Sequence, residues 1–419
     1  MNAQWDASQR YVPNETKVTV LGLGYIGLPT ASVLATKGYQ VFGVDVRADV
    51  VQTINDGRIH IEEPDLDVLV RSAVNSGNLR AGLEPQPADV FIICVPTPIR
   101  PDHSPDLSFI EQACATLRPV IERGNLVILE STSPPRTTED LVVKQAIPTE
   151  MTVGQDVFVA HCPERVLPGR ILLEVVQNDR VVGGITNACA TRAKRFYESF
   201  VNGAVLATTA LTAEVTKLVE NSYRDVNIAF ANELSMLAHR LDIDVWEVIQ
   251  LANRHPRVNI LSPGPGVGGH CISVDPWFLV HADPQGTPLI RTAREVNDSK
   301  PHHVVRRVAK ISQRFNKPCI GCLGLTYKAD VDDLRESPAL DIVRELISEN
   351  IGEVVACDPH VSTERFTDFP LHPLEEVLER ADILVLLTDH RAFWDVPRRV
   401  LEEKIVVDTR GTWRQNRQV

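Results

Sequence analysis

The chain has 419 residues, 43% of them hydrophobic and 23% charged, with a formal net charge of −12. Its length predicts two or three domains, each large enough to form its own core. The acidic balance argues against a nucleic-acid partner, because binding phosphate chains needs basic stripes. No apolar stretch approaches the roughly 20 residues of a membrane span, so no membrane partner is expected.

Residues 1–16 are polar and lack the order of a secretory signal, so we expect a disordered N-terminal extension and no export. The eight cysteines are too scattered for a disulfide framework, which favours a reducing, cytoplasmic location. Cys319 and Cys322 have CxxC spacing, but Cys322 falls in the apolar run CIGCLGL. Since no second pair stands ready to complete a zinc site, no metal is predicted.

The segment 17–45, KVTVLGLGYIGLPTASVLATKGYQVFGVD, has an apolar run, a glycine turn, a helical pattern and a second apolar run. This order is typical of a strand, helix and strand unit. Further apolar runs at 90–95, 126–129 and 157–160 are separated by helical patterns, as in a parallel sheet covered on both faces. We therefore predict a first, doubly wound domain over 17–205.

Gly22, Gly24 and Gly27 form a GxGxxG turn, which lets a pyrophosphate approach the N-terminus of the following helix. Asp45 closes the second strand, where a carboxylate can accept hydrogen bonds from the adenine ribose. Its charge repels the 2′-phosphate of NADP, although Arg47 could pair with one, so NAD is the expected cofactor. A glycine turn that only packs a helix on a strand is the structural alternative.

No glycine or proline occurs between Gly203 and Pro256, which predicts a long helix within a central helical domain over 206–312. Spacings of three, four and three place four polar residues on one face of it: Glu214, Lys217, Asn221 and Arg224. This helix is also the expected interface of a homodimer.

After Pro301, strand patterns return as CIGCLGL, EVVACD, ADILVLLTD and KIVVD. Three of these echo the first domain in the same order, with VTVLGLG matching IGCLGLT, VFGVD matching VVACD, and ADVFIICV matching ADILVLLT. We therefore predict an α/β fold in which two Rossmann-like doubly wound domains, the second over 313–419, are joined by the central helical domain. A shared preference for buried strands, without a true repeat, is the alternative.

The segment 263–277, PGPGVGGHCISVDPW, is rich in glycine and proline before Cys271, which indicates a shaped loop that can approach a ligand closely. A cysteine in such a loop is a candidate nucleophile, since those elsewhere in the chain fall largely in apolar strands. The alternative is that Cys271 is a small buried hydrophobic residue.

Seven motifs occur in order: GLGYIGLPTA, VPTP, ESTSP, CPERVLPG, TAEVTKLVENSYRDVNIAFANE, GPGVGGHCISVDP and GLTYKADVDDLRESPA. Together they resemble the UDP-glucose/GDP-mannose dehydrogenase family, from Lys17 almost to the C-terminus. The resemblance implies that two NAD per substrate oxidise the C6 alcohol of a UDP-sugar to a carboxylate. GRIHIEEPDL, CPERVLPG and NRHPRVNILSPGPGVGGHC are most similar to members that act on UDP-N-acetyl-D-mannosamine, for surface-polysaccharide precursors.

The resemblance also implies the catalytic roles. Cys271 attacks the C6 aldehyde and holds the half-oxidised sugar as a thiohemiacetal and then a thioester. Lys217 and Asn221 stabilise the oxyanion, and Lys217 also moves the proton in the first oxidation. Asp275 and Glu164 are equal candidates to hold or activate the water that releases the product.

Binding roles follow from the same resemblance. The implied cofactor contacts are Gly22, Gly24, Tyr25, Ile26, Gly27, Asp45, Thr97, Thr132 and Arg335. The implied substrate contacts are Arg165, Val166, Lys217, Asn221, Arg224, His255, Arg257, Gly268, Tyr327, Lys328 and Arg410. Arg257 is expected to come from a partner subunit, although any one of these arginines taken alone also suits a solvated surface.

Two departures from the family pattern bear on these roles. Pro135 and Arg136 stand where relatives usually have Val-Gly, which points to a different loop near the nicotinamide. Pro168 stands where UDP-glucose dehydrogenases often carry a second glutamate, which weakens the UDP-glucose interpretation.

Several alternatives stay open. UDP-glucose, UDP-N-acetylglucosamine, UDP-N-acetylgalactosamine and GDP-mannose are rival substrates that share the same motifs. A two-electron dehydrogenase of the 6-phosphogluconate or 3-hydroxyacid type would need no cysteine, and a sensor that binds NAD without turnover is a third possibility.

Overall fold

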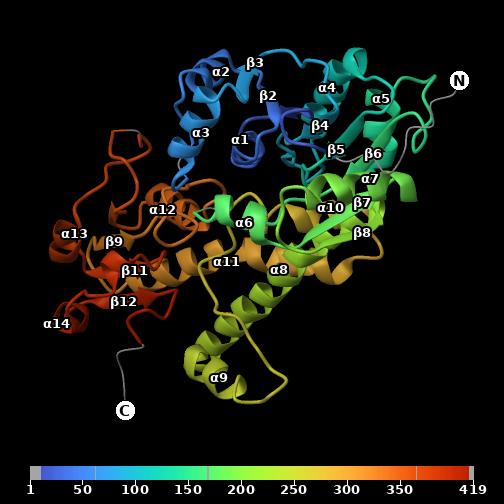
Figure 1. Cartoon of the computed structure of the whole chain (residues 1–419). Helices are drawn as coiled ribbons and strands as arrows, with labels where there is room; N and C mark the ends of the chain where they lie inside the picture. Colours follow the sequence, from blue (N-terminus) through green and yellow to red (C-terminus); the bar gives the residue numbers. More distant parts are fainter. Residues whose placement is uncertain (1–10, 62, 168, 365, 415–419) are drawn as a thin grey trace, which may run out of the picture. The chain divides into compact units, whose positions relative to one another are not determined.

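The computed structural model describes residues 11–61, 63–167, 169–364 and 366–414 of the chain, which is drawn in Figure 1. The chain divides into two compact units, the first ending at Val219 and the second beginning at Glu220. This division falls inside the long helix α8 (Ala210–Leu241). Within the described ranges, no helix is both long and apolar enough to cross a membrane.

The first unit is built on an eight-stranded sheet in the order β3-β2-β1-β4-β5-β6-β7-β8. Neighbouring strands are parallel, except that β6 and β7 are antiparallel. The strands are β1 (Lys17–Leu21), β2 (Gln40–Val44), β3 (Leu79–Gly82), β4 (Val90–Ile93), β5 (Leu126–Leu129), β6 (Phe158–His161), β7 (Arg180–Gly184) and β8 (Val205–Thr209). The predicted doubly wound architecture is therefore confirmed for the first unit.

Helices cover both faces of this sheet, because successive side chains of each buried strand point to opposite sides. On one face lie α1 (Gly27–Thr36), α2 (Ala48–Asn55), α3 (Leu66–Asn75), α6 (Ile171–Gln177) and α7 (Asn187–Glu198). On the other lie α4 (Ser108–Leu117), η1 (Arg118–Val120), η2 (Thr138–Val143) and α5 (Lys144–Ala146). Each face of the sheet has its own hydrophobic core, called here the first and the second core. In β5, Leu126 and Ile128 lie in the first core, whereas Val127 and Leu129 lie in the second.

The structure corrects one expectation for this region and confirms another in part. The expected disordered extension does not include residues 11–16, because Tyr11 is buried and its hydroxyl accepts a hydrogen bond from Arg192 Nε at 3.0 Å; residues 1–10 lie outside the described residues. The predicted long helix is confirmed as α8, which is shorter than the stretch between Gly203 and Pro256. That stretch also holds β8 and α9 (Val245–Ala252), because Asp242 takes a left-handed φ of 55° and Asp244 caps α9.

The second unit contains a four-stranded sheet in the order β10-β9-β11-β12, and all of its pairs are parallel. Its strands are β9 (Cys319–Leu323), β10 (Glu353–Cys357), β11 (Ile383–Leu386) and β12 (Ile405–Asp408). One face is covered by α11 (Pro288–Ser312) and α12 (Pro338–Glu349), and the other by α13 (Leu374–Arg380) and η3 (Arg391–Phe393). This unit also contains α9, α10 (Asp275–Ala282), α14 (Arg398–Glu402) and the C-terminal part of α8.

The sheet order confirms the predicted repeat. The order β10-β9-β11-β12 in the second unit repeats β2-β1-β4-β5 in the first, and the matched sequence segments fall on corresponding strands. The fold is thus the predicted α/β arrangement of two Rossmann-like sheets with a helical region between them in the chain.

Candidate active site

The glycine turn of the first unit joins β1 to α1 and leaves space beside it. Gly22 has a φ of +86°, and a Cβ atom there would lie 2.6 Å from the Cys94 carbonyl oxygen. A Cβ on Gly27 would lie 1.8 Å from the Gly22 carbonyl oxygen, so only glycine fits at these two positions. A Cβ on Gly24 would meet nothing within 4 Å, which leaves room for a ligand at the N-terminus of α1.

Asp45 holds its carboxylate over this turn, directly after β2. Its Oδ2 accepts the backbone N–H of Leu23 at 3.1 Å, and its Oδ1 accepts that of Arg47 at 3.0 Å. The Arg47 guanidinium pairs instead with Asp49, its neighbour two residues on. Asp45 is therefore fixed in place and only partly buried, as an acceptor for ribose hydroxyls requires.

The residues between these glycines also have defined places. Tyr25 packs against the core beneath the turn, and Ile26 is the N-cap residue of α1. An isoleucine side chain carries no polar atom that could cap the helix. The Leu28 N–H already donates to the Gly24 carbonyl oxygen at 3.1 Å and Pro29 has no N–H, so an anionic ligand would be bound by the N–H groups that precede Leu28.

The loops that follow β4 and β5 are tied together. Thr97 Oγ1 donates to the carbonyl oxygen of Thr132 at 2.5 Å, and Ser131 Oγ donates to that of Val95 at 2.7 Å. Both loops leave the carboxyl ends of neighbouring parallel strands, where doubly wound folds bind their ligands. The structure thus brings two predicted cofactor contacts together.

The loop with Pro135 and Arg136 keeps a turn that glycine favours. Arg136 has a left-handed φ of 75°, and its backbone N–H donates to Glu214 Oε2 at 2.6 Å. Thr138 donates to Glu214 Oε1 from both its backbone N–H and its hydroxyl, at 2.8 and 2.6 Å. Burial raises the pKa of Glu214, while these hydrogen bonds oppose that shift. Glu214 on α8 therefore anchors this loop.

Glu164, one of the two candidates for water activation, lies in a buried ion pair. Its Oε2 is 2.7 Å from Nη1 of Arg180, and its Oε1 accepts the backbone N–H of Arg165 at 2.7 Å. The side chains of Glu164 and Arg180 are 7% and 3% exposed. Through these two contacts, the Glu164 carboxylate fixes the start of the loop that follows β6.

Sequence reasoning missed the other members of this network, which are Arg180, Glu130 and Tyr197. Tyr197 Oη donates to Glu130 Oε1 at 2.6 Å, and the Arg180 guanidinium lies 5.4 Å from the centre of the Tyr197 ring. Burial raises the pKa of Glu130, and Arg180 opposes this shift. An acid directly after the apolar strand, at the start of ESTSP, was a usable signal for Glu130, whereas no sequence pattern marks the other two.

In the second unit, Cys271 is exposed at the start of a turn that leads into α10. Its carbonyl oxygen accepts the backbone N–H groups of Val274 at 3.1 Å and Asp275 at 2.8 Å. Asp275 is buried, and its Oδ2 accepts the side-chain amide of Asn221 at 2.5 Å. The structure thus joins three predicted catalytic residues in one arrangement.

The glycines before Cys271 allow close packing of this loop. A Cβ on Gly268 would lie 2.7 Å from Cβ of Tyr327, and one on Gly269 would lie 2.8 Å from the Tyr327 ring. A Cβ on Gly264 would lie 2.7 Å from Nη1 of Arg410. The loop therefore rests directly on two predicted substrate contacts, which explains its glycine content.

Other predicted residues occupy defined but separate places. Arg335 makes three hydrogen bonds to Asp333, one from its backbone N–H and two from its guanidinium, and its carbonyl oxygen accepts the backbone N–H of Gly269 at 3.3 Å. His255 and Arg257 lie in the exposed turn after α9, where the Arg257 N–H donates to His255 Nδ1 at 3.3 Å. Lys328 is exposed in the turn after β9.

The predicted residues on α8 and in the loop after β6 complete the set. Lys217 is partly exposed one helical turn before Asn221, and Arg224 is exposed one turn after it. Arg165 Nη2 donates to the carbonyl oxygen of Asp179 at 2.9 Å, and Val166 packs against the first core.

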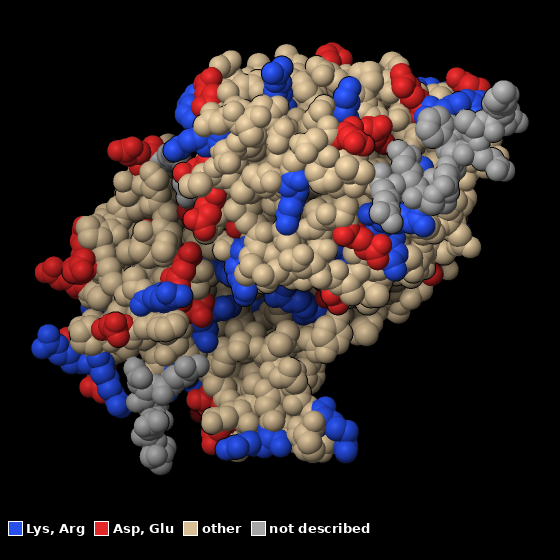
Figure 2. All heavy atoms as spheres, in the orientation of Figure 1, with Lys and Arg blue, Asp and Glu red and all other residues tan. Residues whose placement is uncertain are grey.

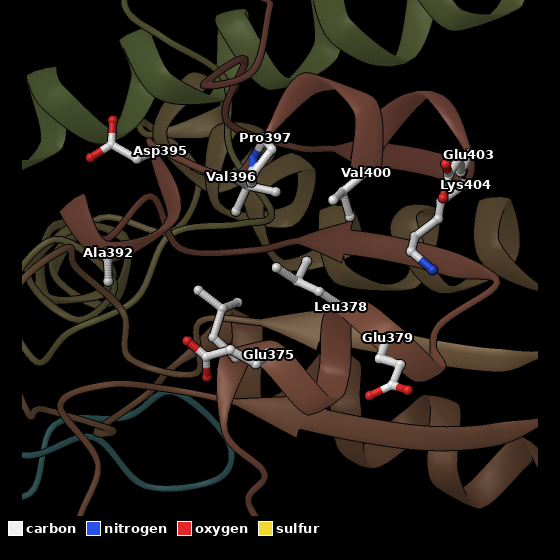
Figure 3. Close-up of a pocket in the computed structure, with 11 residues that line it drawn as sticks. Glu375, Leu378, Glu379, Ala392, Asp395, Val396, Pro397, Val400, Glu403 and Lys404 are labelled. Carbon is white, nitrogen blue, oxygen red and sulfur yellow. The ribbon is translucent and has the colours of Figure 1, made fainter.

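A separate cavity of about 610 Å³ lies in the second unit beside α13, η3 and α14. Figure 3 shows Leu378, Val396 and Val400 lining its apolar part, with the carboxylates of Glu375 and Glu379 at its edge. None of the predicted site residues is among the residues that line it. The cavity is therefore distinct from the arrangement around Cys271.

Both units of the chain match the domains of one known protein family. Residues 16–201 match the NAD binding domain of the UDP-glucose/GDP-mannose dehydrogenase family, residues 211–299 its central domain, and residues 321–415 its UDP binding domain. The three matches together cover most of the chain.

Individual relatives agree with this result over nearly full length. The chain is 53% identical to an NDP-N-acetyl-D-galactosaminuronic acid dehydrogenase from Ralstonia solanacearum, over 96% of this chain and 97% of that protein. It is 51% identical to a UDP-N-acetyl-D-mannosamine dehydrogenase from Campylobacter jejuni, over 91% and 97%. A solved UDP-N-acetyl-mannosamine dehydrogenase from S. aureus superimposes with a TM-score of 0.88 at 44% identity, over 95% of each chain.

Proposed function

Because the chain belongs to the UDP-glucose/GDP-mannose dehydrogenase family, and is an NAD-dependent UDP-sugar dehydrogenase, we propose that it oxidises UDP-N-acetyl-D-mannosamine at C6. The product is UDP-N-acetyl-D-mannosaminuronate, a precursor for surface polysaccharide. The observation that carries the proposal is the exposed Cys271 on a glycine-shaped loop, with Asp275 of the same turn bonded to Asn221.

The reaction removes four electrons, and two NAD molecules each accept one hydride. The C6 alcohol first loses a hydride and a proton and becomes an aldehyde. The Cys271 thiolate adds to C6 and forms a thiohemiacetal, which loses the second hydride and becomes a thioester. Water then attacks C6, the carbon–sulfur bond breaks, and the carboxylate leaves as the thiolate is restored.

The neighbouring residues take the supporting roles. Lys217 and Asn221, one turn apart on α8, donate hydrogen bonds to the oxyanion at C6, and Lys217 accepts the proton in the first oxidation. Asp275 is proposed to hold the water, because it lies in the same turn as Cys271 and its Oδ2 accepts the Asn221 amide. Glu164 is neutralised by Arg180 and positions its loop.

The cofactor fits the first unit. Gly24 leaves open space beside the turn for the pyrophosphate, and Asp45 presents a fixed carboxylate to the adenine ribose. The complete proposed cofactor set is Gly22, Gly24, Tyr25, Ile26, Gly27, Asp45, Thr97, Thr132 and Arg335.

The substrate contacts are proposed from the positions that match family motifs. They are Arg165, Val166, Lys217, Asn221, Arg224, His255, Arg257, Gly268, Tyr327, Lys328 and Arg410. Their cations supply the local positive field that a diphosphate needs in a chain with a net charge of −12.

A substrate panel tests the assignment. NADH formation is measured with UDP-N-acetyl-D-mannosamine, UDP-N-acetylglucosamine, UDP-N-acetylgalactosamine, UDP-glucose and GDP-mannose. We expect the highest kcat/KM with the first, and two NADH for each sugar oxidised. The second candidate is UDP-N-acetylgalactosamine, because the Ralstonia relative carries the galactosaminuronic acid name. Preference for any other sugar nucleotide would contradict the substrate proposal.

Cys271→Ser tests the covalent route. Loss of the thiolate should lower acid formation by about a thousandfold or more, because the half-oxidised sugar is no longer retained. Cys319→Ala, which removes a buried thiol at the start of β9, is the control and should keep turnover. Full acid formation by Cys271→Ser would overturn the mechanism.

A homodimer through α8 and α9 is part of the proposal. Tyr223, Phe230, Leu237 and Leu241 follow one another at seven, seven and four residues on α8, so they share one face, and all four are exposed. Leu251 of α9 is 64% exposed. Figure 2 shows that the surface over α8 and α9 is mostly free of charged side chains, except near its lower end. A second copy of the chain would cover this face.

We propose three functional parts, close to 17–205, 206–312 and 313–419, for NAD binding, dimerisation with catalysis, and UDP-sugar binding. The three family domains support this division, while β8 extends the first sheet to Thr209. We also propose a cytoplasmic location, because Cys271 must remain reduced and the reaction consumes NAD.

A further inference from the structure

The two sheets carry the same turn after their first strands. Gly22 has a φ of +86° and donates its N–H to the Val44 carbonyl oxygen at 2.8 Å. Gly324 has a φ of +87° and donates to the Cys357 carbonyl oxygen at 2.9 Å. In each turn the next residue is a leucine whose N–H donates to the aspartate that follows the second strand, Asp45 or Asp358. Asp358 thus occupies in the second half the position that Asp45 occupies in the first.

The two aspartates differ in what surrounds them. Asp45 is only partly buried and accepts two backbone N–H groups. The side chain of Asp358 is fully buried. Its Oδ2 accepts the N–H of Leu325 at 2.6 Å, that of Thr326 at 3.2 Å and Nε2 of His390 at 3.0 Å, and its Oδ1 accepts the N–H of His360 at 2.8 Å. Its oxygens are therefore engaged within the protein.

His390 is the buried side chain that is hydrogen-bonded to Asp358. Its side chain is fully buried directly beyond the end of β11. Its Nδ1 accepts the backbone N–H of Asp330 at 2.9 Å, so the ring proton lies on Nε2 and is donated to Asp358. One imidazole thus connects the end of β10 to both sides of the turn that follows β9.

This turn carries residues proposed to bind the sugar nucleotide. Thr326 Oγ1 donates to the Lys328 carbonyl oxygen at 2.9 Å, and Thr388 Oγ1 donates to that of Thr326 at 2.6 Å. Tyr327, between them, packs against Gly268 and Gly269, just before Cys271. A displacement of this turn would therefore move both Tyr327 and the loop of the nucleophile.

We infer that Asp358 and His390 form a lock that positions the Leu325–Lys328 turn for binding of the nucleotide part of the substrate. The hydrogen bonds from His390 and from the backbone occupy the Asp358 carboxylate, which would otherwise have to accept the ribose hydroxyls of a dinucleotide. The second half therefore does not bind NAD in the manner of the first. Both residues act through the turn and are positioning residues. The inference rests on the proposed UDP-sugar specificity.

A metal site is the competing interpretation of these residues. Ligand atoms of Asp330, His360 and His390 lie within 4.8 Å of one another. A histidine binds a metal through a free nitrogen lone pair, however, and the Nδ1 lone pair of His390 accepts the Asp330 N–H while Nε2 faces Asp358. The hydrogen bonds therefore favour the lock over a metal.

The test compares His390→Leu, His390→Gln and the control His360→Leu in the full-length chain. Leucine can neither donate to Asp358 nor accept from Asp330, whereas glutamine keeps a donor for Asp358. The His360 ring packs on His390, with centroids 4.8 Å apart, but it is only partly buried and Asp358 is bonded to its backbone. Calorimetric titration with UDP and with NAD measures the two sites separately.

We expect His390→Leu to raise the Kd for UDP and the KM for the sugar nucleotide about tenfold, with the Kd for NAD and kcat changed less than about threefold. His390→Gln should recover part of the loss, and His360→Leu should behave as the unchanged chain. Asp45→Asn provides the reciprocal case and should weaken NAD while leaving UDP binding intact. Unchanged UDP binding in His390→Leu, or equal loss of UDP and NAD binding, would overturn the lock.

Two further measurements keep the outcome decisive. Hydrogen exchange of the peptide covering 324–332 should be faster in His390→Leu than in His360→Leu without any ligand, and equal rates would refute the lock. If the unchanged chain failed to bind UDP, the proposed function would fall, but this exchange comparison would still decide the lock. Equal effects of His360→Leu, His390→Leu and EDTA treatment would establish a metal site instead.

Discussion

At the scale of single residues, the loop after β5 shows how a buried carboxylate can hold a residue other than glycine in a left-handed backbone conformation. A residue other than glycine in the left-handed region costs roughly 1 kcal/mol or more. Arg136 takes this conformation because Glu214 holds its N–H and because Thr138, two residues on, is bonded to the same carboxylate. The hydrogen bonds to Glu214 thus outweigh the preference of an arginine backbone for a negative φ.

Arg136→Gly should therefore stabilise the first unit by up to about 1 kcal/mol. The lost ion pair to Glu139 is exposed and 3.5 Å long, so it offsets little of the gain. Urea unfolding followed by fluorescence should show a higher midpoint. Arg71→Gly, at an exposed position inside α3, is the matched control and should lower the midpoint, because glycine weakens a helix interior. A lower midpoint for Arg136→Gly would contradict the explanation.

At the scale of elements, strand β6 ends in a histidine that the fold keeps neutral. His161 is fully buried between β5 and β7, and neither ring nitrogen has a hydrogen-bond partner among the described residues. Burial lowers its pKa to about 3, from the usual 6.5. The unfolded chain therefore binds a proton at this position at a higher pH than the folded chain does.

The resulting pH dependence has a definite sign. The stability that the neutral ring provides is complete above pH 6.5 and is lost as the pH falls from 6.5 toward 3, by at most about 1.4 kcal/mol per pH unit. His161→Leu should reduce the difference between unfolding midpoints at pH 5 and pH 7.5. His281→Leu, at an exposed position on α10, should leave it unchanged. An unaltered acid sensitivity in His161→Leu would rule out this histidine as its source.

At the scale of the whole molecule, the proposed dimer links the exposed face of α8 and α9 to catalysis. Phe230→Glu with Leu237→Glu places two charges on this face, and desolvating them on association costs several kcal/mol. Light scattering should then show a monomer at concentrations where the unchanged chain is a dimer. Glu233→Lys, also on α8, is the control at a position that is already polar. An unchanged mass of the double variant would exclude this face.

Subunit mixing tests whether Arg257 completes the site of the other subunit. Chains with Cys271→Ala and chains with Arg257→Ala should each be inactive alone. After exchange in equal amounts, half of the dimers are mixed and each has one intact site, so activity should return to about a quarter of the unchanged level. Absence of any recovery after proven exchange would place Arg257 in its own subunit's site or outside both.

The sequence by itself determined the repeated α/β architecture, the cofactor turn and the shaped loop that carries the proposed nucleophile. These features are encoded locally, as buried strands that are apolar along their length, glycines required by a tight turn, and a glycine- and proline-rich loop before Cys271. Sequence pattern did not reveal β3, β7 or β8, because these short strands lack a long apolar run. It predicted the long helix α8 but not where that helix ends, which depends on the left-handed Asp242.

Only the tertiary structure decided which polar residues work together. Glu164 and Arg180 are 16 positions apart, Asn221 and Asp275 are 54 apart, and Asp358 and His390 are 32 apart, and no periodicity connects the members of these pairs. A buried charge or amide takes whichever partner the packing of strands and helices brings within hydrogen-bond distance, because leaving it unpaired costs more than a hydrogen bond returns. The chemistry of each side chain is therefore written in the sequence, whereas its assignment to a role depends on the neighbours that folding supplies.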